Sequence, residues 1–109
     1  MKSQLRTIVS AAGSYTALMF CCPGCAEIMS NDGLHMLPVN NNIKSPSWKW
    51  NGSVDLPTLE PSILTRYNED KICHCFLRDG VFEFLSDCTH SLAGQKIKIG
   101  ELPRWTEYE

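Results

Sequence analysis

Short apolar runs broken by turn-forming residues dominate the hydrophobic pattern of this chain. The strand-like segments are residues 16–20, 34–39, 47–50, 72–78, 81–86 and 95–99. Runs of this length, separated by Gly, Pro, Asn and Asp, are typical of antiparallel β proteins. Only residues 88–93 suggest a helical turn, with Asp87 as its N-cap and Gly94 beyond its C-terminus. The pattern predicts a mainly β fold with one short helix.

The clearest local element is a β-hairpin around Asp79-Gly80. These residue types tolerate the positive φ angles of a type I′ turn, so residue 78 should pair with residue 81. Side chains alternate between the two faces of a strand. One face then carries Cys73, Cys75, Leu77, Phe82, Phe84, Ser86 and, if the strand continues, Cys88; the other carries His74, Phe76, Arg78, Val81, Glu83, Leu85 and Asp87. We expect the first face, apolar and cysteine-rich, to face the core.

Prolines interrupt the pattern in two places. Pro57 and Pro61 frame residues 57–62, which neither a helix nor a central strand accommodates easily, because proline lacks an N–H donor. We predict that this segment is irregular and is held by its surroundings. The tail with Pro103 and Trp105 is expected to pack as an edge strand or coil.

Length and charge exclude several classes of function. A chain of 109 residues has the usual size of one domain, so residues 1–109 are predicted to form a single domain. The net charge is −2 and the ten Lys and Arg residues are scattered. Nucleic-acid binding needs clustered cations against phosphates, so we expect no nucleic-acid partner.

The N-terminal segment predicts a cytoplasmic protein. Residues 1–20 are interrupted by Ser10, Gly13, Ser14 and Thr16, so they lack the unbroken apolar region of a signal peptide and are interpreted as part of the mature β fold. No stretch approaches the roughly 18 apolar residues of a membrane span, so we expect no membrane partner. In a reducing compartment the six cysteines are better explained as metal ligands or buried apolar residues than as disulfides.

The cysteine spacing predicts a structural zinc site. Residues 22–25 form a Cys-x-x-Cys turn, like that of a zinc ribbon, and the hairpin brings two further cysteines to the core face. The predicted tetrahedral ligands are Cys22, Cys25, Cys73 and Cys88. His74 and His90 compete for the second pair, because Cys₂His₂ and Cys₃His sites are equally ordinary. The alternative for the first pair is a redox-active or simply buried pair of thiols.

The opposite face of the hairpin suggests different chemistry. There the alternation puts His74 near Asp87. A carboxylate that orients an imidazole is the arrangement used for general-base catalysis. The structural metal and the reactive groups are thus predicted to lie on opposite sides of one hairpin.

An ordered set of motifs resembles a phage and bacterial family that occurs beside bacterial ubiquitin-like conjugation operons. The motifs are Cys22-Pro23-Gly24-Cys25, the Trp48–Gly52 element, Pro57–Leu64, Cys73-His74 with Phe76, Asp79-Gly80 and Asp87–Gln95. The resemblance covers roughly residues 18–103. It implies a small zinc-stabilised peptidase of serine type, similar to deubiquitinases, whose substrate is a ubiquitin-like modifier joined to a target protein. If a phage encodes the chain, its location would be the cytoplasm of the host bacterium.

The resemblance also implies roles for individual residues. Ser62 is the candidate nucleophile and His74 the candidate base, with Asp87 or His90 as the third member. His35 also matches a histidine of the family and is a further candidate for the base. A serine hydroxyl is a poor nucleophile until a nearby imidazole takes its proton, so the distance between Ser62 and a histidine decides the matter.

Other interpretations of these residues remain open. Ser62 after Pro61 is otherwise a turn hydroxyl or helix cap, and Asp87 is otherwise only an N-cap. A zinc-dependent hydrolase would use Glu60 or Glu27 as its base. A non-enzymatic zinc-binding module that contacts a host protein would show no open surface around the candidate nucleophile.

Overall fold

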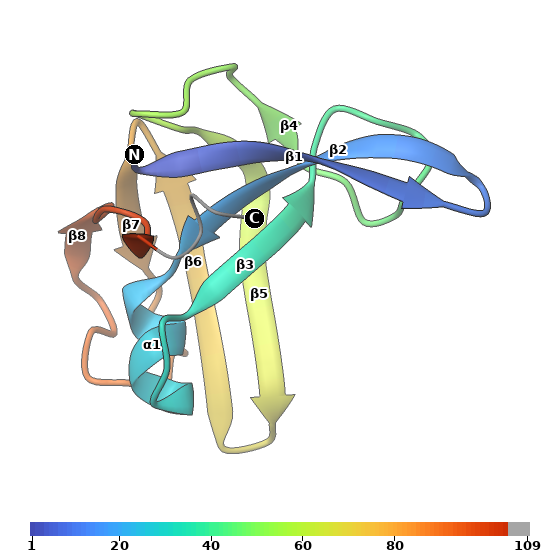
Figure 1. Cartoon of the computed structure of the whole chain (residues 1–109). Coiled ribbons are helices and arrows are strands. Elements are labelled where there is room, and N and C mark those ends of the chain that lie inside the picture. The colour runs from blue at the N-terminus through green and yellow to red at the C-terminus, as the bar shows by residue number, and fades with distance from the viewer. Residues whose placement is uncertain (105–109) are drawn as a thin grey trace.

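The computed structural model describes residues 1–104 as two antiparallel sheets and one short helix (Figure 1). The first sheet has the order β1-β2-β3, with β1 (Ser3–Ser10), β2 (Gly13–Cys21) and β3 (Leu34–Pro38), and α1 (Pro23–Met29) connects β2 to β3. The second has the order β4-β5-β6-β7-β8, with β4 (Lys49–Trp50), β5 (Leu59–Asn68), β6 (Lys71–Arg78), β7 (Val81–Phe84) and β8 (Lys96–Lys98). The predicted mainly β class is confirmed.

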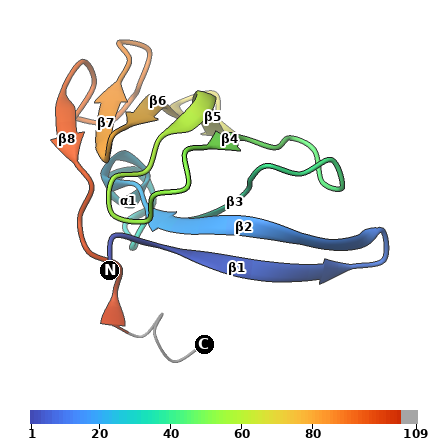
Figure 2. The same ribbon diagram turned by 90° about the horizontal axis from the view of Figure 1, so that it is seen from above.

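The two sheets share one hydrophobic core. Leu18 and Phe20 of β2 belong to the same buried cluster as Leu59, Leu77 and Phe82 of the second sheet. These side chains are at most 1% exposed. The far end of the β1–β2 hairpin extends beyond the second sheet in both views (Figures 1 and 2). The buried half of β2 therefore carries the chain into the core, directly before the Cys-x-x-Cys segment.

The β6–β7 hairpin confirms the prediction from alternation. Arg78 pairs with Val81, and Asp79 and Gly80 have φ angles of 49° and 73°. The core-facing side chains Cys73, Cys75, Leu77, Phe82, Phe84 and Cys88 are buried. Ser86 is exposed, because β7 ends at Phe84 and the alternation stops there.

The helix lies elsewhere than predicted. Residues 88–93 form turns, and the helix spans Pro23–Met29. Pro23 fits the first helical turn, where its missing N–H has no partner to lose. Gly24 allows His90 to pack against this helix, since a Cβ at Gly24 would lie 2.3 Å from His90 Nε2. Tertiary packing thus selects a seven-residue helix that has little intrinsic stability.

The prediction that residues 57–62 are irregular is wrong for their second half. β5 begins at Leu59 and runs through Pro61. A register shift between Leu59 and Ile63 absorbs the proline, which lies on a side of the strand where little pairing is lost. Residues 1–20 form two strands rather than one, with a turn at residues 11–12. Trp105 lies outside the described residues.

None of the helices among residues 1–104 has the length and apolar character that crossing a membrane requires.

Candidate active site and metal site

The bulge in β5 carries Ser62 to the surface beside β6. Leu59 pairs with Leu77 and Ile63 with Cys75, so four residues of β5 advance against two of β6. The extra residues bend the strand, as β-bulges near functional sites commonly do. Ser62 is half-buried on the side of the strand away from the core.

Ser62, His74 and Asp87 form a continuous hydrogen-bonded chain. The Nε2 atom of His74 lies 3.1 Å from Ser62 Oγ, and its Nδ1 atom lies 3.0 Å from Asp87 Oδ2 and 3.3 Å from Oδ1. A carboxylate only accepts hydrogen bonds, so it fixes the proton of the neutral ring on Nδ1. The lone pair of Nε2 is then directed at the Ser62 hydroxyl, within the reach that proton transfer requires.

The main chain of His74 is fixed by the segment that follows β7. The His74 carbonyl accepts a hydrogen bond of 2.9 Å from the Leu85 amide. The Cys88 sulfur accepts from the His74 amide at 3.2 Å, and its thiol donates to the His74 carbonyl at 3.1 Å. Burial is the main cause that raises the pKa of Cys88, which keeps the thiol protonated for this role. Cys88 therefore positions the histidine.

The three side chains are open to solvent. The side chain of His74 is 23% exposed and that of Asp87 is 54% exposed. Beside them, Leu64 is 52% exposed, on the strand position that pairs with His74. A macromolecule can therefore reach Ser62 without a movement of the fold.

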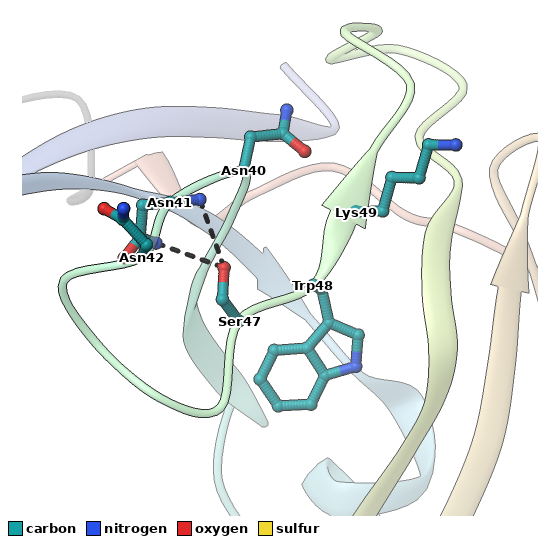
Figure 3. Close-up of a pocket in the computed structure, with 6 residues that line it drawn as sticks. All are labelled: Asn40, Asn41, Asn42, Ser47, Trp48 and Lys49. Atoms are coloured by element: carbon teal, nitrogen blue, oxygen red, sulfur yellow. Dashed lines mark hydrogen bonds between the residues drawn. The ribbon is translucent and has the colours of Figure 1, made fainter.

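A polar loop supports the strand that carries Ser62. Residues 40–49 surround a hollow of about 600 Å³, lined by Asn40, Asn41, Asn42, Ser47, Trp48 and Lys49 (Figure 3). Ser47 Oγ accepts hydrogen bonds from Asn41. The indole Nε1 of Trp48 donates to the Ser62 carbonyl at 3.4 Å. The Trp48–Gly52 motif thus connects this loop to the candidate nucleophile.

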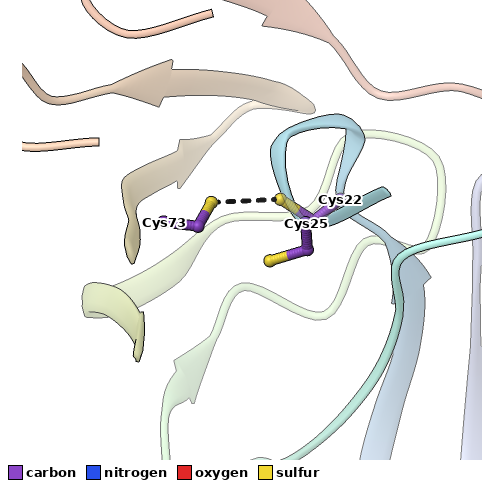
Figure 4. Close-up of side chains that lie close together, drawn as sticks. All are labelled: Cys22, Cys25 and Cys73. Carbon is purple, nitrogen blue, oxygen red and sulfur yellow. Dashed lines mark hydrogen bonds between the residues drawn. The ribbon is translucent and has the colours of Figure 1, made fainter. Parts of the chain in front are cut away.

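Three buried thiols meet on the core side of the same hairpin. Cys22 precedes α1, Cys25 lies in its first turns, and both face Cys73 of β6 (Figure 4). Their sulfur atoms lie within 4.8 Å of one another, and those of Cys22 and Cys73 are 3.6 Å apart. Two thiolates on a tetrahedral Zn²⁺ are about 3.8 Å apart, given Zn–S bonds of about 2.3 Å. The group can hold a metal ion.

The electrostatics of the thiols also suit a cation. Contacts with Cys25, Cys73 and Cys75, in that order, hold the pKa of Cys22 well below its ordinary value. The contact with Cys22 is the main cause that raises the pKa of Cys73. One thiol of the group thus ionises readily while its neighbours keep their protons. A divalent cation would remove this competition by binding all of them as thiolates.

His35 lies at the same group. Its Nε2 atom is 3.2 Å from Cys25 Sγ, and its ring stacks on Phe20 at a centroid distance of 5.4 Å. Burial opposes its charged form, but the contacts with Cys22 and Cys25 outweigh burial and raise the pKa of His35 to about 9. The sequence offered His35 only as a candidate base. The pairing of Phe20 with His35 between β2 and β3, which follows from the hairpin-like order of the two strands, was the signal for its position.

Cys88, predicted as the fourth ligand, does not join Cys22 and Cys25. It lies within 4.8 Å of Cys73 and His90 instead. The Nδ1 atom of His90 accepts a hydrogen bond of 3.1 Å from the Leu92 amide, so the neutral ring carries its proton on Nε2. That Nε2 atom is buried without a hydrogen-bond partner. A nitrogen that keeps its proton cannot bind a metal, so His90 fits packing better than ligation.

The geometry disfavours the zinc-dependent hydrolase. Cys22, Cys25 and Cys73 are at most 2% exposed, whereas a catalytic zinc keeps a position open to water and substrate. The carboxylate of Glu27 accepts hydrogen bonds from the amide and hydroxyl of Ser91. These bonds, the hydroxyl first, lower the pKa of Glu27. Its carboxylate is thus engaged in joining α1 to the segment after β7.

Comparison with known proteins gives the family. Neither the curated proteins nor the solved structures yielded a match. The family model described as bacterial ubiquitination-like system serine protease (BubE) matches residues 1–85. The matched region contains Ser62, His74 and the group of three thiols. The expected relationship to ubiquitin-like conjugation systems is confirmed at this level, and the chain belongs to the family of bacterial ubiquitination-like system serine proteases.

Proposed function

We propose that this protein is a serine peptidase or isopeptidase that releases a ubiquitin-like modifier from its target protein. The observation that carries the proposal is the hydrogen-bonded chain from Ser62 through His74 to Asp87, with 3.1 Å between Ser62 Oγ and His74 Nε2. The family implies a protease with a protein substrate. The exposed position of the three side chains suits a large substrate.

The reaction follows from the protonation states of the three residues. Ser62 Oγ attacks the carbonyl carbon of the scissile amide while His74 Nε2 takes the hydroxyl proton. The C–N bond then breaks and His74 returns this proton to the leaving amine. Water, deprotonated by the same nitrogen, hydrolyses the ester and restores Ser62. Asp87 stabilises the imidazolium that forms in each half, and main-chain N–H groups beside Ser62 are the candidate donors to the oxyanion.

The role of Asp87 is tested by Asp87→Asn. An asparagine no longer favours the Nδ1–H tautomer or the imidazolium, so we expect labelling by a fluorophosphonate probe and conjugate cleavage to slow by about 10²- to 10⁴-fold. Both rates are measured on the purified variant, whose melting temperature should be unchanged. Asp70→Asn, at the tip of the β5–β6 hairpin, is the matched control and should keep both rates. Equal rates for the two variants would reduce Asp87 to a surface residue.

We further propose that the thiol group binds a structural Zn²⁺ with His35 as the fourth ligand. The supporting observations are the three buried sulfur atoms and the 3.2 Å separation of His35 Nε2 from Cys25 Sγ. Three thiolates and one imidazole form an ordinary structural set. The zinc would fix α1 and β3 against β6, and no chemical step runs through it.

His35→Phe tests this ligand set. Phenylalanine retains a ring against Phe20 but offers no nitrogen, so we expect Zn²⁺ affinity to fall by at least about 100-fold, more than the usual effect of a residue that only supports a ligand. Competition with a chromophoric chelator measures the affinity. Cys88→Ser is the informative comparison and should bind Zn²⁺ like the unchanged protein. The opposite outcome, tight binding by His35→Phe and weak binding by Cys88→Ser, would restore Cys88 as the ligand.

A further inference from the structure

Beyond its bulge, β5 has an unpaired edge that starts at the candidate nucleophile. β4 pairs only with Leu59 and Glu60, whereas β6 pairs with β5 as far as Asn68. Figure 1 shows β4 beside only the upper end of β5. In the part of the chain that the structure describes, no strand pairs with the other side of β5 after Ser62. An edge of this kind is a template for another extended chain.

The main-chain groups that face this edge can be identified from β6. The amide and carbonyl of His74 are engaged away from β5, by Cys88 and Leu85. In an antiparallel pair, opposite residues direct these groups either toward each other or both away. Leu64 is opposite His74, so its N–H and C=O face the unpaired edge.

The same reasoning applies two residues further along. The carbonyl of Ile72 accepts a hydrogen bond from the Thr89 amide at 2.9 Å, away from β5. Arg66 is opposite Ile72 and therefore also presents its N–H and C=O to the edge. Among the described residues, no hydrogen bond to these main-chain groups of Leu64 or Arg66 is found. Two donors and two acceptors thus lie in a row, starting two residues after Ser62.

At its far end this edge reaches an apolar hollow. The hollow has a volume of about 360 Å³ and is lined by Met29, Asn31, Asp32, Gly33, Leu34 and Tyr67. Tyr67 is its contribution from β5, while the other residues come from α1, β3 and the segment between them. Met29, Leu34 and Tyr67 are 40%, 37% and 39% exposed. A side chain from a chain paired with β5 could bury apolar surface there.

We propose that an extended tail of the protein substrate adds as a strand to the β5 edge over residues 64–66 and enters the 360 Å³ hollow with an apolar side chain. The proposal rests on the proposed serine peptidase function. The edge is continuous with Ser62, so a tail held there presents its next peptide or isopeptide bond to the hydroxyl. Main-chain hydrogen bonds supply affinity in such complexes, and side-chain pockets supply selectivity. The substrate class is therefore a modifier or target with a flexible, extended segment next to the scissile bond.

Leu64→Pro tests the proposal, because it removes the outward N–H and places a ring on the edge. Proline is tolerated at outward positions of edge strands, so the fold should persist. We expect kcat/KM for a fusion of the system's ubiquitin-like protein to a fluorescent reporter to fall at least about tenfold, the scale of a lost hydrogen bond. Labelling of Ser62 by a small fluorophosphonate probe, which makes no use of the edge, should be unchanged.

The matched control is Lys98→Pro. Ile99 donates to the Gly80 carbonyl, so by alternation the Lys98 amide faces the outer edge of β8, on the opposite side of the second sheet. This variant should cleave the fusion normally. Arg66→Pro provides a second edge variant should Leu64→Pro fail to fold, and we expect the same loss. Normal cleavage by a folded edge variant would overturn the docking proposal, whereas unlabelled Ser62 in the unchanged protein would overturn the peptidase function itself.

Discussion

Ser62→Ala should abolish conjugate cleavage, with a loss of at least about 10³-fold in kcat. Alanine removes the attacking oxygen, and no other hydroxyl is found within hydrogen-bonding distance of His74 among the described residues. The measurement is the release of the reporter from a modifier fusion, together with mass-spectrometric detection of the labelled serine after fluorophosphonate treatment.

The controls for this variant separate chemistry from folding. Ser62 is half-buried at a bulge and its hydroxyl contacts only His74 among the printed partners of its side chain, so the variant should keep its melting temperature and metal content. Ser14→Ala, at an exposed strand position of the distant β1–β2 hairpin, should keep full activity. Cleavage by a folded Ser62→Ala protein at the unchanged rate would exclude the serine mechanism.

The opposite placement of metal and base could be predicted because it depends on local geometry. The Asp79-Gly80 turn fixes the register of the hairpin, and a shift of one residue would exchange the faces of every side chain. Cys73 therefore had to face the core once His74 faced outward. The buried Cys73 and the exposed contact of His74 with Asp87 follow that alternation.

The neighbours supplied by other strands could not be predicted in the same way. Ser62 reaches His74 because a bulge in β5 shifts its pairing with β6, and no local pattern specifies that shift. His35 reaches Cys25 because β3 pairs with β2 across an intervening helix. The contact between Gly24 and His90 likewise joins segments far apart in the chain. Propensity and alternation describe single strands and hairpins, whereas these contacts depend on tertiary packing.

Removal of Zn²⁺ should unfold the protein rather than merely inactivate it. Structural zinc contributes roughly 10–16 kcal/mol in zinc-finger peptides, which is comparable with or larger than the 5–15 kcal/mol that typically stabilises a whole domain. We expect chelation, or Cys73→Ser, to eliminate the cooperative thermal transition and the near-ultraviolet circular dichroism. Cys21→Ser, which replaces a half-exposed thiol outside the group of Cys22, Cys25 and Cys73, should keep both signals and the zinc content.

The order of the losses decides between a structural and a catalytic metal. If zinc only fixes α1 and β3 against β6, cleavage and the folded signal should decline together as chelator is added, because Ser62 and His74 need only the folded sheet. A catalytic zinc would be lost with activity while the fold persisted. Activity that disappears at chelator concentrations leaving the circular dichroism unchanged would therefore contradict the structural role and favour metal-activated water. Burial of the three thiols to at most 2% exposure is the reason that we expect the joint decline.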